Sequence, residues 1–357
     1  MCADALLSLG EPQGQLIATH LAGLRDEPLE QELTGSLERM LSVEPTTRSL
    51  PRLAVDWRFG CVEALRWTGA AWDGFEPLER FVRALVELTT TPAELVASLD
   101  WDARLAPERL RVHRLLARLR TLHVAPWNVR PDHQPLWRLL REVGLPPRVR
   151  ELVIDDVPHP RRDTHQLTWV ELGDLSDTWP ALAQLEALWL RGSYLSTGRI
   201  VLPNARAFTL VSSTFTDVDA LRAADWPMLE TLSVCFGDDS YAERAVSLDE
   251  VRALLRELPP TLKHLGLRNL PFTDELLPFL ARWPGLARLE SLDLSLGVLL
   301  DGARALRELA PAFRHLVRLD VTDTGLPDLE ALQREVPGLW RGRQWRDKAA
   351  RYVSLTE

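Results

Sequence analysis

The chain has 357 residues, of which 46% are hydrophobic and 26% charged, so it contains enough apolar material for a continuous core and does not resemble a disordered protein. Its formal net charge of -9 argues against a general affinity for nucleic acid or for an anionic membrane. The three cysteines, Cys2, Cys61 and Cys235, are far apart and form no C-x-x-C pair, which excludes a disulfide framework and a structural zinc site of the usual spacing.

Motifs for catalysis, cofactors and transport across a membrane are absent from the sequence. We find no phosphate-binding glycine loop, no dinucleotide fingerprint, no H-E-x-x-H and no G-x-S-x-G, and the eight histidines show no metal-ligand spacing. No apolar run approaches about 18 residues, and the start of the chain lacks a basic segment followed by an apolar one. We therefore expect a cytoplasmic protein that is not an enzyme and that has no cofactor, no metal and no contact with a membrane.

Residues 1 to about 45 are expected to form two helices. Leucines recur at spacings of three and four on both sides of a break at Gly10-Glu11-Pro12, and the pattern resumes after Pro28. Because the end unit of a repeat array must close its core, we interpret this segment as a helical cap, with a separate binding domain as the alternative.

The wording of residues 3–17, A-D-A-L-L-S-L-G-E-P-Q-G-Q-L-I, resembles the A-D-W-L-x-x-x-G-D-P-R-G-E-F-I wording of a bacterial domain that precedes leucine-rich repeats. The likeness covers some 20 residues. It departs from the family at Ala5 and Gln13, where Trp and Arg are usual, and a helix usually found upstream is missing. The segment from Trp57 to Trp67 is similar to the W-R-x-G-F-V wording that follows this repeat-companion domain, with Cys61 in place of Phe. The resemblance implies a helical companion segment followed by a repeat array, but it implies no chemistry.

Leucine spacing predicts the repeats themselves. Leu289, Leu292, Leu294 and Leu299 occupy positions 1, 4, 6 and 11 of the leucine-rich pattern L-x-x-L-x-L-x-x-N-x-L, with Gly297 at the position where Asn or Cys is usual. Positions 4 and 6 lie two apart, so both point to the same face of a short strand. We place position 1 of successive repeats at Val62, Val96, Leu119, Val149, Leu185, Ala205, Leu229, Leu262, Leu289 and Leu316.

The longer intervals between repeats are expected to contain helices. Apolar periodicity predicts helices over 75–88 and 107–119, and Ser247-Leu-Asp-Glu250 is a capping box that begins a helix ending near Glu257. The sequence over 158–163, P-H-P-R-R-D, is expected to project as a loop from an insertion over 156–184. The tail from Trp340 is locally basic and is expected to be a C-terminal cap, with contact to an acidic partner or to nucleic acid as the alternative.

Strand geometry then predicts a binding surface. Positions 3, 5 and 7 point away from the leucines, towards the concave side of the sheet, where extended solenoids bind their partners. The candidate residues at these positions are Arg66, Asp100, His123, Glu151, Asp155, Trp189, Arg191, His264, Arg268, Asp293, Arg318 and Asp320. Trp189 with Arg191 is the expected hot spot, because Trp and Arg dominate binding energy at interfaces. The alternative for Trp189 is that it packs beneath the loop over 158–163.

A reactive thiol is a minor hypothesis. Cys235 and Arg268 both fall at position 7 of adjacent repeats, so we expect them to be neighbours, and a thiolate beside Arg would be activated. A lone Cys is more often a small packed residue, so no catalytic residue is assigned.

The sequence therefore predicts an α/β leucine-rich-repeat solenoid, with a curved parallel sheet on the concave face, helices and irregular segments on the convex face, and a helical N-terminal cap. The expected segments are 1–50 for the companion or cap, 51–339 for the solenoid and 340–357 for the cap or tail. The expected function is a non-catalytic scaffold that binds a protein or peptide on the concave face. The alternative is a regulatory or inhibitory subunit of an enzyme that acts through an acidic surface.

Overall fold

The structure is a computed structural model that describes residues 6–7, 11–41, 43, 53–69, 75–90, 106–126, 132–154, 167, 170–237, 242, 244–299, 302–325, 329–340 and 342. The chain is mixed α/β and divides into two compact units. Unit 1 comprises Met1–Asn128 and Pro135–Val157, and unit 2 comprises Val129–Gln134 and Pro158–Glu357. The division falls inside the segment that the sequence assigns to one repeat array.

The helices of unit 1 agree with the apolar periodicity. The segment expected to form two helices contains α2 (Pro12–Leu21) and α3 (Glu27–Met40). The helices expected over 75–88 and 107–119 are α4 (Glu76–Thr90) and α6 (Ala106–Leu115), the latter extended by a 3-10 turn, η1 (Leu116–Arg118). A further helix, α7 (Gln134–Val143), buries Leu136, Trp137, Leu139 and Leu140. These helices form because each presents one apolar stripe to the sheet.

The sheet of unit 1 begins with a hairpin that the leucine pattern did not predict. Strand β1 (Leu53–Arg58) pairs antiparallel with β2 (Cys61–Gly69) around Phe59 and Gly60, whose φ values are both positive, as a type I′ turn requires. Strands β3 (Thr121–Pro126) and β4 (Glu151–Ile154) then continue the sheet in parallel.

No strand from the repeat predicted at Val96 lies between β2 and β3. Strand β2 pairs directly with β3, with Ala64 opposite Thr121, so nothing stands between them. The sequence from Val96 matches the apolar spacing of a repeat, but strand pairing is a tertiary property that a single short match does not fix. Residues 91–105, including Asp100, lie outside the described residues.

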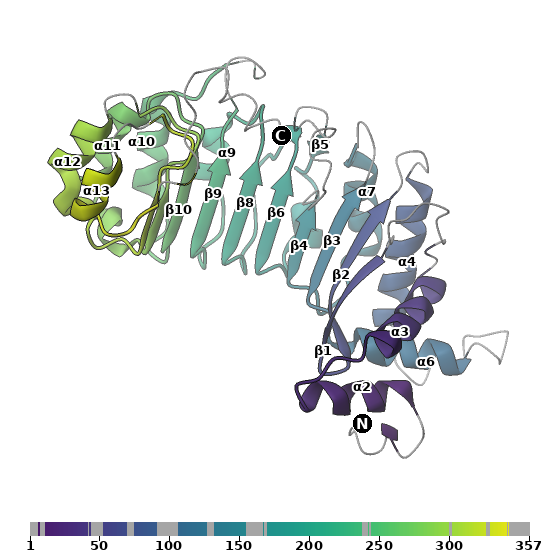
Figure 1. Ribbon diagram of the computed structural model, residues 1–357. Coiled ribbons are helices and arrows are strands. Elements are labelled where there is room, and N and C mark those ends of the chain that lie inside the picture. The colour runs from purple at the N-terminus through teal and green to yellow at the C-terminus, as the bar shows by residue number, and fades with distance from the viewer. Residues whose placement is uncertain are drawn as a thin grey trace. The chain divides into compact units, whose positions relative to one another are not determined.

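Among the described residues of unit 2, the large sheet has seven parallel strands. Figure 1 shows strands and helices of this unit. The strands, in their order in the sheet, are β6 (Ala187–Arg191), β8 (Ala207–Val211), β9 (Thr231–Cys235), β10 (His264–Arg268), β11 (Ser291–Asp293), β12 (Arg318–Asp320) and β13 (Leu339–Trp340). The helices are α8 (Trp179–Leu182), α9 (Val218–Arg222), α10 (Leu248–Glu257), α11 (Thr273–Leu280), η4 (Pro284–Arg288), α12 (Gly302–Phe313) and α13 (Leu329–Glu335).

Two strands of unit 2 form a separate small sheet. Strand β5 (Glu171–Asp174) pairs in parallel with β7 (Ser193–Ser196). Neither strand was predicted, because each is four residues long and lacks the leucine spacing. The loop expected over 158–163 and Asp155 lie outside the described residues.

Eight of the other predicted repeats have a strand that begins where the apolar spacing places it. Strands β3, β4, β6, β8, β9, β10, β11 and β12 each begin at position 3, two residues after the predicted position 1. The register pairs position 3 with position 3 throughout unit 2, so that Ala207, Thr231, His264, Ser291 and Arg318 follow Ala187 in a single row. Every described position 1 is buried, as the need to cover one apolar face requires. The same register identifies one more unit, which begins at Val336 and was not predicted.

A regular hydrogen-bond ladder joins the repeats at the start of their strands. The carbonyl of Arg206 accepts from the amides of Glu230 and Thr231, both at 2.8 Å, and the carbonyl of Glu230 accepts from Lys263 and His264 at 2.8 and 2.9 Å. The side chains continue this contact, since Glu230 pairs with Arg206 and lies 3.5 Å from the Nζ of Lys263. The positive charge of Lys263 lowers the pKa of the Glu230 carboxyl the most, and the hydrogen bond from Arg206 lowers it further.

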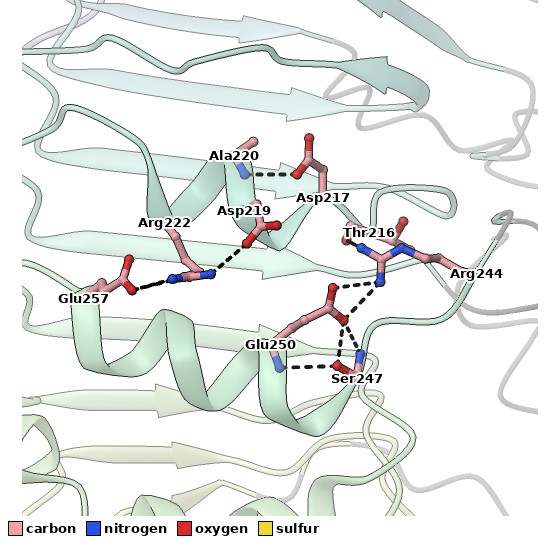
Figure 2. Close-up of polar contacts among 9 residues, drawn as sticks. All are labelled: Thr216, Asp217, Asp219, Ala220, Arg222, Arg244, Ser247, Glu250 and Glu257. Atoms are coloured by element: carbon pink, nitrogen blue, oxygen red, sulfur yellow. Dashed lines mark hydrogen bonds and ion pairs between the residues drawn. The ribbon is translucent and has the colours of Figure 1, made fainter.

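Helices α9 and α10 begin with side-chain caps, as Figure 2 shows. The predicted capping box is present: the Oγ of Ser247 accepts from the amide of Glu250 at 3.3 Å, and Glu250 accepts from the amide of Ser247 at 2.8 Å. Arg244 adds an ion pair to Glu250 at 2.8 Å, and Arg222 on α9 reaches Glu257 at the end of α10 at 2.6 Å. Neighbouring repeats are thus joined through their helices as well as through their strands.

Candidate functional site

The open face of unit 2 is the side of its large sheet that carries positions 3, 5 and 7. Positions 4 and 6, such as Leu188 and Leu190, are buried against the other side, and the alternating side chains point away from that core. The residues of the open face are Ala187, Trp189, Arg191, Ala207, Thr209, Val211, Thr231, Ser233, Cys235, His264, Gly266, Arg268, Ser291, Asp293, Arg318, Asp320 and Trp340.

A central row crosses this face from one tryptophan to another. The register places Trp189, Thr209, Ser233, Gly266, Asp293, Asp320 and Trp340 side by side. Trp189 is 38% exposed and Trp340 is 54% exposed, whereas the residues next to Trp189 are small. Large aromatic side chains that remain exposed on a folded surface are typical of interaction sites.

Trp340 was predicted only as part of a tail. It belongs to the sheet instead, because Leu339 pairs with Leu319 and Trp340 with Asp320. The apolar signal was present in Val336 and Leu339, but the intervening Pro337-Gly338 is typical of a turn and hid it. The remainder of the basic tail, apart from Gly342, lies outside the described residues.

Arg268 is held at one end of its side chain. Its Nε donates to the Oγ of Ser295 at 3.0 Å and lies 3.6 Å from Asp293. Asp293 in turn accepts from the amide of Ser295 at 2.8 Å. In the part of the chain that the structure describes, neither η nitrogen of Arg268 has a partner, although 27% of the side chain is exposed. The guanidinium is thus held at Nε, and the four N–H groups of its η nitrogens have no partner among the residues described.

Arg318, Asp320 and Trp340 form a second polar and aromatic group. Arg318 pairs with Asp320 at 2.6 Å, and its guanidinium carbon lies 4.8 Å from the centre of the Trp340 ring. Asp320 also accepts from the amide of Thr322 at 2.9 Å and is only 7% exposed. Asp320, one of the predicted contact residues, thus uses both carboxylate oxygens to hold Arg318 and the following turn.

Small polar groups fill the middle of the open face. The Nδ1 of His264 lies 2.9 Å from the Oγ of Ser291, so this predicted residue is already hydrogen-bonded within the protein. The hydroxyl groups of Thr209, Thr231 and Ser233 make no hydrogen bond among the residues described, and all three side chains are half-buried. They remain able to donate to and accept from a ligand.

The expected hot-spot pair lies on one face. Trp189 and Arg191 are two residues apart on β6, so both point to the open side, where Trp189 is exposed and Arg191 is half-buried.

Cys235 is opposite Arg268, as the repeat spacing predicted. The thiol is fully buried, however, at 0% exposure, so a substrate cannot reach it.

The predicted residues of unit 1 that the structure describes lie on β2, β3 and β4. Arg66 lies opposite His123 in the register, and the Oε2 of Glu151 accepts from the hydroxyl of Thr121 at 3.0 Å. Arg66, His123 and Glu151 are all half-buried.

The described ranges contain neither a candidate metal-binding cluster nor a candidate membrane-spanning helix. No group of three or more His, Cys, Asp or Glu side chains there could hold a metal ion. No helix in those ranges is both long and apolar enough to cross a membrane.

Comparison with known proteins gives a likeness of fold. No protein-family model matches the chain, and no curated protein matches it. Among solved structures, the chain is similar to a Bacteroides fragilis protein determined by the Northeast Structural Genomics Consortium, with a TM-score of 0.54 and 23% identity. The match covers 64% of this chain and 66% of that one. Likeness at this identity concerns the fold alone.

Proposed function

We propose that this protein is a non-catalytic interaction module of the leucine-rich-repeat kind, which binds a protein or peptide across the open face of unit 2. The observation that carries the proposal is the central row from Trp189 to Trp340, in which two exposed aromatic side chains flank small polar residues and two aspartates. Exposed Trp is the side chain that contributes most to binding energy at protein interfaces.

The repeat geometry supports the solenoid part of the proposal. Strands that begin at the same position of each unit, buried apolar residues at positions 1 and 4, and the shared carbonyl ladder all recur from β6 to β12. Arrays built in this way present a wide, regular surface to a partner. The resemblance of residues 3–17 and 57–67 to repeat-companion proteins points in the same direction.

Two observations favour binding over the other hypotheses. The burial of Cys235 removes the one nucleophile that the sequence offered for catalysis on this face. The open face carries Arg191, Arg268 and Arg318 against Asp293 and Asp320, so it is not the acidic surface that an inhibitor of a basic active site needs.

Photo-crosslinking tests the proposal. A benzophenone amino acid placed at Thr209, on the open face, is expected to capture a partner when cells of the native organism are irradiated. The matched control carries the same group at Glu275, an exposed residue on α11. A Trp189→Ala, Arg191→Ala double variant in the Thr209 background should lose the adduct. Adducts that form equally from Glu275, or that persist in the double variant, would show that the open face is not the binding surface.

A further inference from the structure

We propose that the open face of unit 2 recognises an acidic segment of its partner, with Arg268 binding a carboxylate. This inference rests on the proposed function, because it names the chemistry of the partner that binds there. It begins with local charge: the chain as a whole carries -9, yet the open face has three arginines and two aspartates. The excess of cations on this surface is opposite to that of the whole protein.

The charged side chains of the open face differ in how far they are already paired within the protein. Asp320 is buried and both of its oxygens are used, and Asp293 accepts from the Ser295 amide while it lies beside Arg268. The carboxylates thus serve to orient the arginines. The side chain of Arg318 is 52% exposed and that of Arg268 is 27% exposed, so an incoming anionic group can reach both guanidiniums.

Arg268 is prepared for bidentate binding. Its Nε is already bonded to Ser295, which fixes the plane of the guanidinium before a ligand arrives. The two η nitrogens, without partners in the described structure, can donate in parallel to the two oxygens of a carboxylate. The entropic cost of ordering a long side chain is reduced because one end is held in advance.

The neighbouring residues leave room for a ligand beside Arg268. Cys235, opposite it on β9, is small and buried, and Gly266 on the same strand has no side chain. A Cβ at Gly266 would lie 2.6 Å from the Oγ of Ser233. The absence of a side chain at this position therefore lets the Ser233 hydroxyl lie directly beside the backbone of β10. A main chain that crosses these strands can approach the hydroxyl of Ser233.

The length of the surface sets the length of the segment. Six strand-to-strand steps separate Trp189 from Trp340, which at about 4.8 Å each is about 29 Å. An extended chain covers about 3.3 Å per residue, so roughly nine residues span the row. A segment with apolar residues near its ends and carboxylates between them would match both tryptophans, the half-buried Arg268 and the exposed Arg318.

Peptide pools of defined composition test this inference. Three fluorescein-labelled pools of twelve residues share Leu or Phe near both ends and Gly or Ser elsewhere. They differ only at four central positions, which are Glu, Gln or Lys. Binding to the full chain is measured by fluorescence anisotropy. We expect the Glu pool to bind about tenfold more tightly than the Gln pool, and the Lys pool to bind weakest.

The variants separate Arg268 from the rest of the face. Arg268→Gln is expected to remove the preference for Glu over Gln, whereas Arg256→Gln, at an exposed arginine of α10, should leave it unchanged. High salt should reduce the preference in the unmodified protein. Circular dichroism confirms that each variant is folded.

The outcomes distinguish this inference from the proposed function. Equal binding of the Glu and Lys pools, a preference that survives in Arg268→Gln, or binding of no pool would overturn the role of Arg268 in recognising an acidic segment. If the Gln pool binds as well as the Glu pool, and Trp189→Ala abolishes both, the open face is a binding surface but not an acid-selective one. If the probe at Thr209 captures no partner in the otherwise unmodified protein, the proposed function itself is overturned.

Discussion

The side-chain amide of Gln13 donates to the Sγ of Cys61 across 3.8 Å and to the carbonyl of Gly60 across 3.2 Å. These bonds fasten α2 to the turn between β1 and β2, where His20 also accepts from the amide of Gly60 at 3.1 Å. Gln13 and Cys61 are two of the positions at which the sequence departs from the repeat-companion wording. The two departures from that wording are thus in contact in the structure.

The first prediction concerns this contact. Gln13→Ala removes the bond to a buried carbonyl, and we expect it to lower the free energy of unfolding by about 1–2 kcal/mol. Gln15→Ala is the matched control, because Gln15 is exposed on the same helix and makes only a 3.4 Å bond to Asp26. Urea denaturation measures both variants. Equal effects of the two substitutions would contradict a specific role for Gln13.

The second prediction concerns the turn itself. Gly60 has a φ of 67°, and a Cβ there would lie 2.8 Å from the backbone nitrogen of Ile17 and overlap its Cγ1 atom. Gly60→Ala should therefore cost more than about 2 kcal/mol, the sum of left-handed strain and displacement of α2. Gly23→Ala separates the two causes, since Gly23 has a φ of 71° but nothing within 4 Å of such a Cβ. If both variants lose the same thermal stability, contact with Ile17 has no effect.

The third prediction concerns the capping box of α10. Ser247→Ala removes the acceptor for the Glu250 amide, and we expect a loss of about 1 kcal/mol in the free energy of unfolding. Asp249→Ala in the same turn should cost less than about 0.5 kcal/mol, because its pair with Arg252 is on the surface. Chemical denaturation of the two variants checks the order, and a larger loss for Asp249→Ala would be inconsistent with the cap.

The fourth prediction concerns pH. His133 is fully buried, and this burial lowers its pKa to about 4 although Glu171 accepts a hydrogen bond from its ring. In the unfolded state the pKa of His133 is near 6.5. Between pH 6.5 and 4, His133 therefore binds a proton in the unfolded state but stays neutral in the folded state. Stability should therefore fall by up to about 3 kcal/mol as the pH drops through this window.

The test for His133 is a comparison with a neutral donor. His133→Asn retains an N–H group but cannot take up the proton, so it should lose less stability than the unmodified protein between pH 7 and 4.5. Carboxyl groups titrate in both proteins, and the difference between them isolates His133. If the urea midpoints of His133→Asn and of the unmodified protein change in parallel across this pH range, the prediction is wrong.

The leucine spacing alone was sufficient to position most of the strands. Positions 1, 4 and 6 must be buried together, so a residue such as Leu289 determines where β11 begins and which way Asp293 points. The helix beginning at Ser247 was equally predictable, because a capping box is a local interaction among four residues.

Other features depended on contacts between distant segments. The repeat spacing at Val96 gave no strand between β2 and β3, and Val336 began a unit behind a Pro-Gly sequence that suggested only a turn. The burial of Asp320 and Cys235 could not be derived from their positions on the strand. Their neighbours on adjacent strands, Arg318 and Arg268 among them, determine how much of each side chain remains exposed.

The sequence by itself determined the period of the repeats, the phase of the strands and the identity of the residues on the open face, because burial of an apolar stripe follows from local spacing. The tertiary structure alone decided which of those residues are available to a partner. Exposure and hydrogen bonding depend on groups brought together from different repeats, and this is why Arg268 and Trp340 became the prominent residues of the surface while Asp320 became part of its support.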